Sequence, residues 1–221
     1  MIADIADPAL AFSIHSPAHS PAHPPAHPPA DALDSAPDGP ALDRLLFARI
    51  LGLAAQRADG VTASLGLTRD ALAELIRRHA AGFAHLLPLL PDDSGEDAIE
   101  EEDLRAFLLD HRAAGTVEEE WLAAIVARRA LGPNHLWQDM GFANRRELNA
   151  MFRRHFPSLV ALNSGDMKWK KFFYRQLCER EGLMLCKSPN CEVCDDFSAC
   201  FSAEDGDPLS SLARAARGEG A

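Results

Sequence analysis

The chain has 221 residues but few cysteines and few lysines, and it lacks the signatures of several common protein classes. No run of apolar residues approaches the roughly 18 that a transmembrane helix requires. The first residues, MIADIADPALAF, lack the positive charge of a secretory signal, so we expect a cytoplasmic protein with no membrane partner. Since no G-x-G-x-x-G, P-loop or nucleophile-elbow motif is present, nothing indicates a nucleotide-dependent enzyme.

Positive and negative charges are unevenly distributed along the chain. The formal net charge of −11 argues against a nucleic-acid partner, which would need a broad basic face. Residues 92–120 contain twelve acidic residues, whereas residues 145–175 contain eight lysines or arginines. All four lysines lie between residues 168 and 187. Four arginines precede these lysines, and we expect them to lie on ordinary solvated faces of helices: Arg145, Arg146, Arg153 and Arg154.

Residues 1–40 contain no lysine, arginine or glutamate, and they hold nine of the 15 prolines. They include the repeat HSPAHSPAHPPAHPPA, which cannot bury enough apolar surface to offset the entropy of ordering it. We predict a disordered leader over residues 1–40. Its repeated histidines are also candidates for weak metal binding: His15, His19, His23 and His27.

From residue 41 the apolar pattern is helical, and no long stretch alternates with period two. We predict an all-α protein with a single helical domain over residues 41–203 and a flexible tail over residues 204–221. Thr68 is a predicted N-cap, and the pairs Thr116–Glu119 and Asn144–Glu147 are predicted capping boxes. The predicted helices cover residues 41–57, 68–87, 100–115, 116–131, 144–156 and 167–182.

Several single residues have simple structural interpretations. The acidic run Glu100–Asp103 suits the first turn of a helix, where carboxylates complement the helix dipole. Cys178 is expected to be a packed thiol rather than a metal ligand. We expect the tryptophans to anchor the core and four histidines to be hydrogen-bonded at its boundary: Trp121, Trp137, Trp169, His79, His111, His135 and His155.

The sequence CKSPNCEVCDDFSAC holds four of the five cysteines, in the spacing C-x4-C-x2-C-x5-C. Turn-forming residues separate them, which predicts a cysteine-rich metal-binding loop over residues 183–201. Disulfides are not expected in a reducing compartment. The candidate ligands are the four thiols of this run: Cys186, Cys191, Cys194 and Cys200.

Three chemistries remain open for these thiols. A structural zinc ion accepts four thiolates, but such sites usually combine two C-x2-C pairs, and only one is present. A redox dithiol at Cys191 and Cys194 is disfavoured because neighbouring acidic residues raise thiol pKa values. Ligation of an iron–sulfur cluster fits the local spacing best.

This cysteine run follows MKWKKFFYRQLCEREG, and together they resemble the NifQ family of nitrogen-fixation proteins. The segment HLWQDMGFANRRELNAMFRRHFPSLVALN is similar to that family too, so the resemblance covers roughly residues 41–203. It implies an iron–sulfur protein, with a cluster of the 3Fe or 4Fe type, that donates molybdenum to nitrogenase iron–molybdenum cofactor biosynthesis. Its implied partners are molybdate, the cofactor scaffold and the nitrogenase iron protein, and Cys186, Cys191, Cys194 and Cys200 inherit the ligand role.

The resemblance implies a carrier rather than an enzyme. The alternative from the residues alone is a zinc-stabilised helical adaptor protein with a structural four-cysteine site. A site that receives molybdate should offer cationic groups for the oxyanion. The candidates flank the cysteine run: Lys168, Lys170, Lys171, Arg175 and Lys187.

Overall fold

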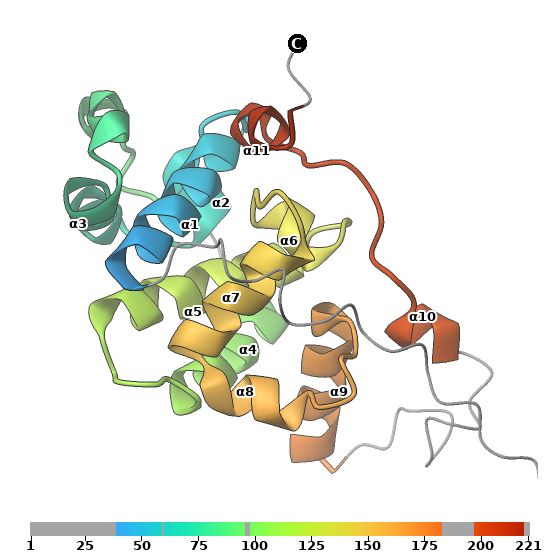
Figure 1. Cartoon of the computed structure of the whole chain (residues 1–221). Helices are drawn as coiled ribbons and strands as arrows, with labels where there is room; N and C mark the ends of the chain where they lie inside the picture. Colours follow the sequence, from blue (N-terminus) through green and yellow to red (C-terminus); the bar gives the residue numbers. More distant parts are fainter. Residues whose placement is uncertain (1–38, 59, 96–97, 183–196, 219–221) are drawn as a thin grey trace, which may run out of the picture. The chain divides into compact units, whose positions relative to one another are not determined.

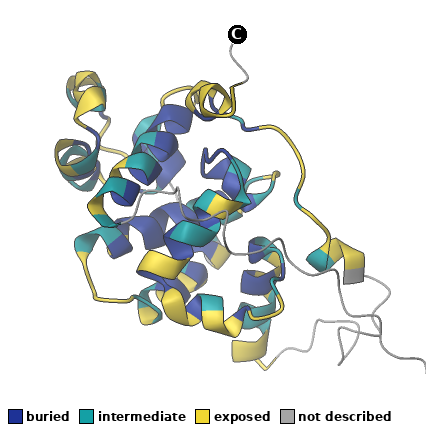
Figure 2. Ribbon diagram, in the orientation of Figure 1, coloured by how far each residue is buried: buried dark blue, intermediate teal, exposed yellow. Residues whose placement is uncertain are grey.

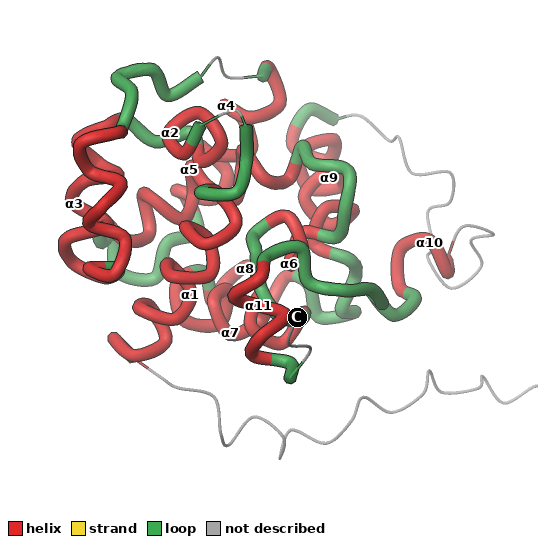
Figure 3. Tube along the Cα trace, turned by 90° about the horizontal axis from the view of Figure 1, so that it is seen from above, coloured by secondary structure: helices red, strands yellow, loops and turns green. Residues whose placement is uncertain are grey.

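The computed structural model describes residues 39–58, 60–95, 98–182 and 197–218, and these residues form helices and loops without a strand (Figures 1 and 3). The predicted all-α class is confirmed. The predicted leader lies outside the described residues, except for its last two positions, which begin the first helix. The helices are α1 (Gly39–Ala54), α2 (Val61–Leu65), α3 (Arg69–His79), the 3-10 helix η2 (Ala81–Leu89), α4 (Ile99–Asp110), α5 (Val117–Ala130), α6 (Leu136–Asp139), α7 (Arg145–His155), α8 (Pro157–Leu162), α9 (Trp169–Arg180), α10 (Phe197–Phe201) and α11 (Ser211–Ala216).

Within these ranges, no helix combines the length and the apolar character that crossing a membrane would require.

Side-chain caps define where the main helices begin. The hydroxyl of Thr68 accepts a hydrogen bond from the N–H of Ala71 at 3.3 Å, so the predicted cap of α3 is confirmed. The capping box of Thr116 and Glu119 at the start of α5 is complete. At α7 the predicted box is half right, because Asn144 caps Glu147 but the glutamate carboxylate accepts from the N–H of Ala143, one residue earlier.

Two predicted helices are too long. The helix predicted over residues 68–87 ends at His79, and η2 replaces its second half. Helix η2 contains Gly82 and Pro88, both poor α-helix formers. The helix predicted to end at Gly115 stops at Asp110.

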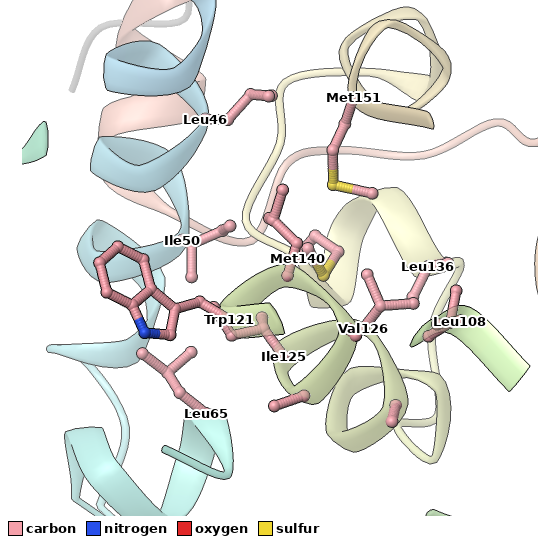
Figure 4. Packing of buried hydrophobic residues seen from close by; sticks show 14 of the residues in the cluster. Leu46, Ile50, Leu65, Leu108, Trp121, Ile125, Val126, Leu136, Met140 and Met151 are labelled. Atoms are coloured by element: carbon pink, nitrogen blue, oxygen red, sulfur yellow. The ribbon is translucent and has the colours of Figure 1, made fainter. Parts of the chain in front are cut away.

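The core is formed mainly by α1, α3, α4, α5, α6, α7 and α9 (Figures 2 and 4). Helix α5 lies at its centre, since every residue from Trp121 to Ala127 is buried. Leu46 and Ile50 of α1 and Met151 of α7 face it in Figure 4. The three tryptophans are buried, which confirms them as core anchors: Trp121, Trp137 and Trp169.

A buried carboxylate joins α4 to α5. The acidic run does lie in the first turn of α4, but Glu101 is fully buried rather than solvated. Its carboxylate accepts from Nε of Arg128 at 2.9 and 2.7 Å and from Arg105 at 3.1 Å. Since a buried charge is tolerated only when it is paired, these arginines allow the first turn of α4 to enter the core.

The segment predicted as a flexible tail contains the short helix α11, which packs on α1. Ser210 caps α11 by accepting from the N–H of Ala213 at 3.1 Å, and both residues are fully buried. The guanidinium of Arg49 in α1 donates to the carbonyl of Leu212. The last three residues, 219–221, lie outside the described residues.

A second buried ion-pair network joins α1 to α7. Nε and Nη2 of Arg154 donate to the two oxygens of Asp43 at 2.7 and 2.8 Å, and Nε2 of His155 lies 2.9 Å from Oδ1. Arg154 is exposed, as the sequence predicted, but its pairing with Asp43 was not predicted. Burial raises the pKa of Asp43, but hydrogen bonding by Arg154 and the charge of His155 outweigh it, so the net shift of the pKa is downward. Burial also lowers the pKa of His155, which the charge of Asp43 only partly offsets.

We predict that Gly141→Ala is far more destabilising than Gly115→Ala. Both glycines have positive φ, +79° and +70°, but a Cβ at Gly141 would lie 2.6 Å from the carbonyl oxygen of Arg49, whereas nothing lies within 4 Å at Gly115. The expected losses in the free energy of unfolding are about 3 kcal/mol or more and about 1 kcal/mol, respectively. Urea denaturation of the two variants measures the difference, and equal losses would contradict this packing.

We also predict that the free energy of unfolding falls between about pH 7.5 and pH 5.5. The pKa of His155 is lower in the folded state than its ordinary 6.5, so below that pH the unfolded chain binds a proton that the folded chain does not. The stability that the ionised carboxylate of Asp43 contributes is lost only at lower pH, because the pKa of Asp43 is also lowered in the folded state. The fall should be smaller in His155→Gln; an unchanged pH dependence in that variant, measured by urea denaturation, would exclude this residue as the source.

Candidate metal centre

One of the four predicted cysteine ligands lies within the described residues. Cys200 is in α10, where it is partly buried and packs against the core. The sequence predicted a loop at this position, and the short helix is a correction to that prediction. Cys186, Cys191 and Cys194 lie outside the described residues, so their predicted ligand role stays a prediction.

Backbone and side-chain contacts fix α10 to the beginning of α9. The N–H of Lys168, the residue before α9, donates to the carbonyl of Cys200 at 2.8 Å. Its ammonium group donates to the hydroxyl of Ser202 at 2.9 Å. The ring of Phe201 lies against Gly165, where an added Cβ would be 3.5 Å from it. Residue 182 follows the C-terminal end of α9, whereas Cys200 is bound at the N-terminal end of the same helix. These two ends are about 18 Å apart along the helix axis.

The predicted oxyanion-binding cations have different surroundings. Lys168 is the one held next to Cys200. The ammonium group of Lys170 donates to the carboxylate of Asp139 at 2.6 Å and to the carbonyl of Gly132 at 2.7 Å, so it connects α9 to α6. Arg175 pairs with Glu179 on its own helix at 2.6 Å, Lys171 is exposed, and Lys187 lies outside the described residues.

The four histidines agree with their structural interpretation, whereas the packed role expected for Cys178 stays a prediction. Cys178 is partly buried on α9. Among the residues that the structure describes, no group of three or more histidine, cysteine, aspartate or glutamate side chains is arranged to hold a metal ion. Each of the four histidines lies within 3.3 Å of a polar side chain, in the pairs His79–Glu118, His111–Ser158, His135–Glu204 and His155–Asp43.

Arg145 is a residue whose role the sequence did not predict. Its Nη2 donates to both the carbonyl and the carboxylate of Asp166, at 3.1 and 2.9 Å, and to the carbonyl of Met167 at 3.1 Å. Its Nε lies 3.4 Å from Oε2 of Glu204. Arg145 therefore contacts the residues just before Lys168 and a residue that follows Cys200. It is not a solvated helix-face arginine.

The backbone at Asp166 supports a special role for this contact. Asp166 has a φ of +54°, a left-handed conformation that costs free energy in a residue with a side chain. The hydrogen bonds from Arg145 to its carbonyl and carboxylate hold it there. The sequence offered no signal for the contact of Arg145 with Glu204, because Glu204 fell in a segment predicted to be flexible.

Comparisons with known proteins agree with one another. A protein-family model described as NifQ matches residues 46–202. The chain is 36% identical over 194 residues to "Protein NifQ homolog" of Sinorhizobium fredii, covering 83% of this chain and 84% of that protein. It is 42% identical to "Protein NifQ" of Azotobacter vinelandii, covering 63% of this chain and 78% of that protein, and 40% identical to "Protein NifQ" of Rhodobacter capsulatus, covering 65% and 79%. No solved structure matches the chain.

We predict that Lys170→Met destabilises the fold and that Lys171→Met does not. The first substitution leaves the buried carboxylate of Asp139 without its ammonium partner, which should cost about 1–3 kcal/mol. The second removes an exposed charge from the adjacent position of the same helix. Thermal denaturation compares the two variants, and equal stability would show that the contact of Lys170 with Asp139 contributes nothing.

Proposed function

The chain belongs to the NifQ family, and on that premise we propose that it is a carrier that holds an iron–sulfur cluster and donates molybdenum to nitrogenase cofactor biosynthesis in nitrogen fixation. The observation that carries this proposal is the family match over residues 46–202, because it includes all four cysteines of the C-x4-C-x2-C-x5-C run. In this proposal the helical domain and the cysteine segment act together, and the His-Pro repeat takes no part.

The donor set of the cysteine run fits an iron–sulfur cluster. Thiolates are the usual ligands of such clusters, and four of them would be supplied by Cys186, Cys191, Cys194 and Cys200. When bound, a cluster of the 3Fe or 4Fe type would supply the bridging sulfides among which molybdenum can be accommodated. The positive charge of Lys168, held beside Cys200, favours the thiolate form of the ligand and an anionic cluster.

Delivery of a metal requires an accessible site. Ser198 and Ala199 of α10 are exposed, so the described end of the cysteine segment is open to a docking partner. We propose that the cofactor scaffold and the nitrogenase iron protein are these partners and that molybdate is the cargo that the carrier receives. Lys171 of α9 is exposed, and in this proposal its ammonium group contributes positive charge for an incoming oxyanion.

Anaerobic purification tests this proposal. We expect a brown protein that contains iron and acid-labile sulfide, with a paramagnetic resonance signal and with molybdenum in a fraction of the chains. Cys191→Ala and Cys194→Ala should lose the iron and sulfide but keep the helical circular dichroism, because the described helices form a core of their own. Cys178→Ala is the matched control, and it should retain the cluster.

A colourless protein with one zinc ion per chain, after anaerobic expression with iron supplied, would overturn the carrier and favour the zinc-stabilised adaptor. Collapse of helical content in Cys191→Ala would likewise identify the cysteine segment as a folding element.

A further inference from the structure

Arg145 and Cys200 bind opposite edges of one peptide group, the one between Met167 and Lys168. Nη2 of Arg145 donates to the carbonyl oxygen of this group at 3.1 Å, and its N–H donates to the carbonyl of Cys200 at 2.8 Å. A peptide group is planar and rigid, so the two hydrogen bonds keep a fixed relation to each other. The backbone of Cys200 is therefore tied to α7 through a single rigid unit.

The charge of Arg145 strengthens this chain of hydrogen bonds. A guanidinium group that donates to a carbonyl makes a stronger bond than a neutral donor does. It also polarises the amide, and the N–H on the opposite edge becomes a better donor. Loss of Arg145 would therefore weaken the bond to Cys200 and also remove the contact with Met167.

The loop before α9 depends on Arg145 for its place as well as its shape. Asn163 closes this loop locally, because its Nδ2 donates to the carbonyl of Met167 and its Oδ1 accepts from the N–H of Met167, both at 2.9 Å. Arg145 comes from a different helix and binds Asp166, whose φ of +54° needs support, as well as Met167. It therefore connects the loop to α7, which Asn163 does not do.

Arg145 also contacts the chain that follows Cys200. Its Nε lies 3.4 Å from Oε2 of Glu204, whose side chain is 3% exposed and whose Oε1 lies 3.3 Å from Nδ1 of His135. Neither Nε nor Oε2 has a hydrogen-bond partner among the described residues, so their contact is an ion pair in a place where water screens charge weakly. One guanidinium group thus restrains both the peptide that binds Cys200 and the chain four residues after it.

We propose that Arg145 is a positioning residue for Cys200. It acts through the peptide group of Lys168 and through the carboxylate of Glu204, and in this way it fixes the place of the thiol relative to α7. The inference extends to the cluster if the carrier function proposed above holds, on which this extension rests. Arg145 then determines how firmly the cluster is retained, because it places one of the four candidate ligands.

Thiol reactivity tests the positioning without any cluster. In a full-length chain whose other four cysteines are replaced by serine, Cys200 is the only thiol. Its rate of alkylation by iodoacetamide under native conditions reports how often it leaves its packed position. Arg145→Ala in this background should raise the rate about tenfold or more, the effect of losing one hydrogen bond to a charged group.

Two substitutions on the same helix are the matched controls. Arg146→Ala removes the adjacent arginine, which is exposed. Arg154→Ala removes the hydrogen bonds to the buried carboxylate of Asp43 near the other end of α7, so it controls for a general loss of stability. Both variants should leave the rate of Cys200 alkylation as it is in the parent chain.

Arg145→Lys is the milder variant of the same position. Lysine keeps the positive charge but lacks the planar fork with which arginine binds Asp166, Met167 and Glu204 together. It should raise the alkylation rate by less than Arg145→Ala does. If Arg145→Ala fails to fold, the comparison of Arg145→Lys with Arg154→Ala decides the question.

Iron retention is the second measurement, made on anaerobically purified protein with its natural cysteines. Arg145→Ala should lose iron to a chelator about tenfold faster than Arg154→Ala, because residues that orient a metal ligand contribute to the affinity for the metal. Its paramagnetic resonance signal should also differ from that of the wild type, since a displaced thiolate changes the surroundings of the iron.

Equal alkylation rates in the Arg145 variant and Arg154→Ala would overturn the inference, whether or not the chain holds a cluster. Faster alkylation with an unchanged rate of iron loss would overturn its extension to the cluster. A wild-type chain that never acquires iron would refute the carrier function, and the alkylation rates would then decide the positioning of Cys200 by themselves.

Discussion

The hydrogen bond from the N–H of Lys168 to the carbonyl of Cys200 determines where the described end of the cysteine segment lies. It brings the last cysteine of the run to the N-terminal end of α9, beside an ammonium group that also binds Ser202. Any centre built on the four cysteines must therefore form next to this helix end and its positive charge. The position follows from a backbone bond, so it does not depend on the chemistry of the thiols.

Arg145 connects this arrangement to the rest of the fold. From the first position of α7 it binds the chain just before Lys168 and the carboxylate just after α10. Arg145 therefore links the position of Cys200 to the start of α7.

The supporting framework depends on buried charges that are paired across helices. Glu101 with Arg128 joins α4 to α5, Asp43 with Arg154 joins α1 to α7, and Asp139 with Lys170 joins α6 to α9. Removing Arg128, Arg154 or Lys170 would take a cationic partner from a buried carboxylate, which is costly, so these contacts constrain how the helices meet. They also explain why several charges in the basic and acidic regions are not available at the surface.

The sequence determined the helical class, the caps at Thr68 and Thr116, the buried faces and tryptophan anchors, and the family, because local periodicity, capping and motif spacing are properties of neighbouring residues. It determined the spacing of the cysteines in the same way. Only the tertiary structure decided that Arg145 and Arg154 are paired, that Glu101 is buried, and that the chain after residue 203 packs on α1. These contacts join residues from about 20 to 160 positions apart, and the free energy of a buried pair depends on which distant side chain supplies the opposite charge.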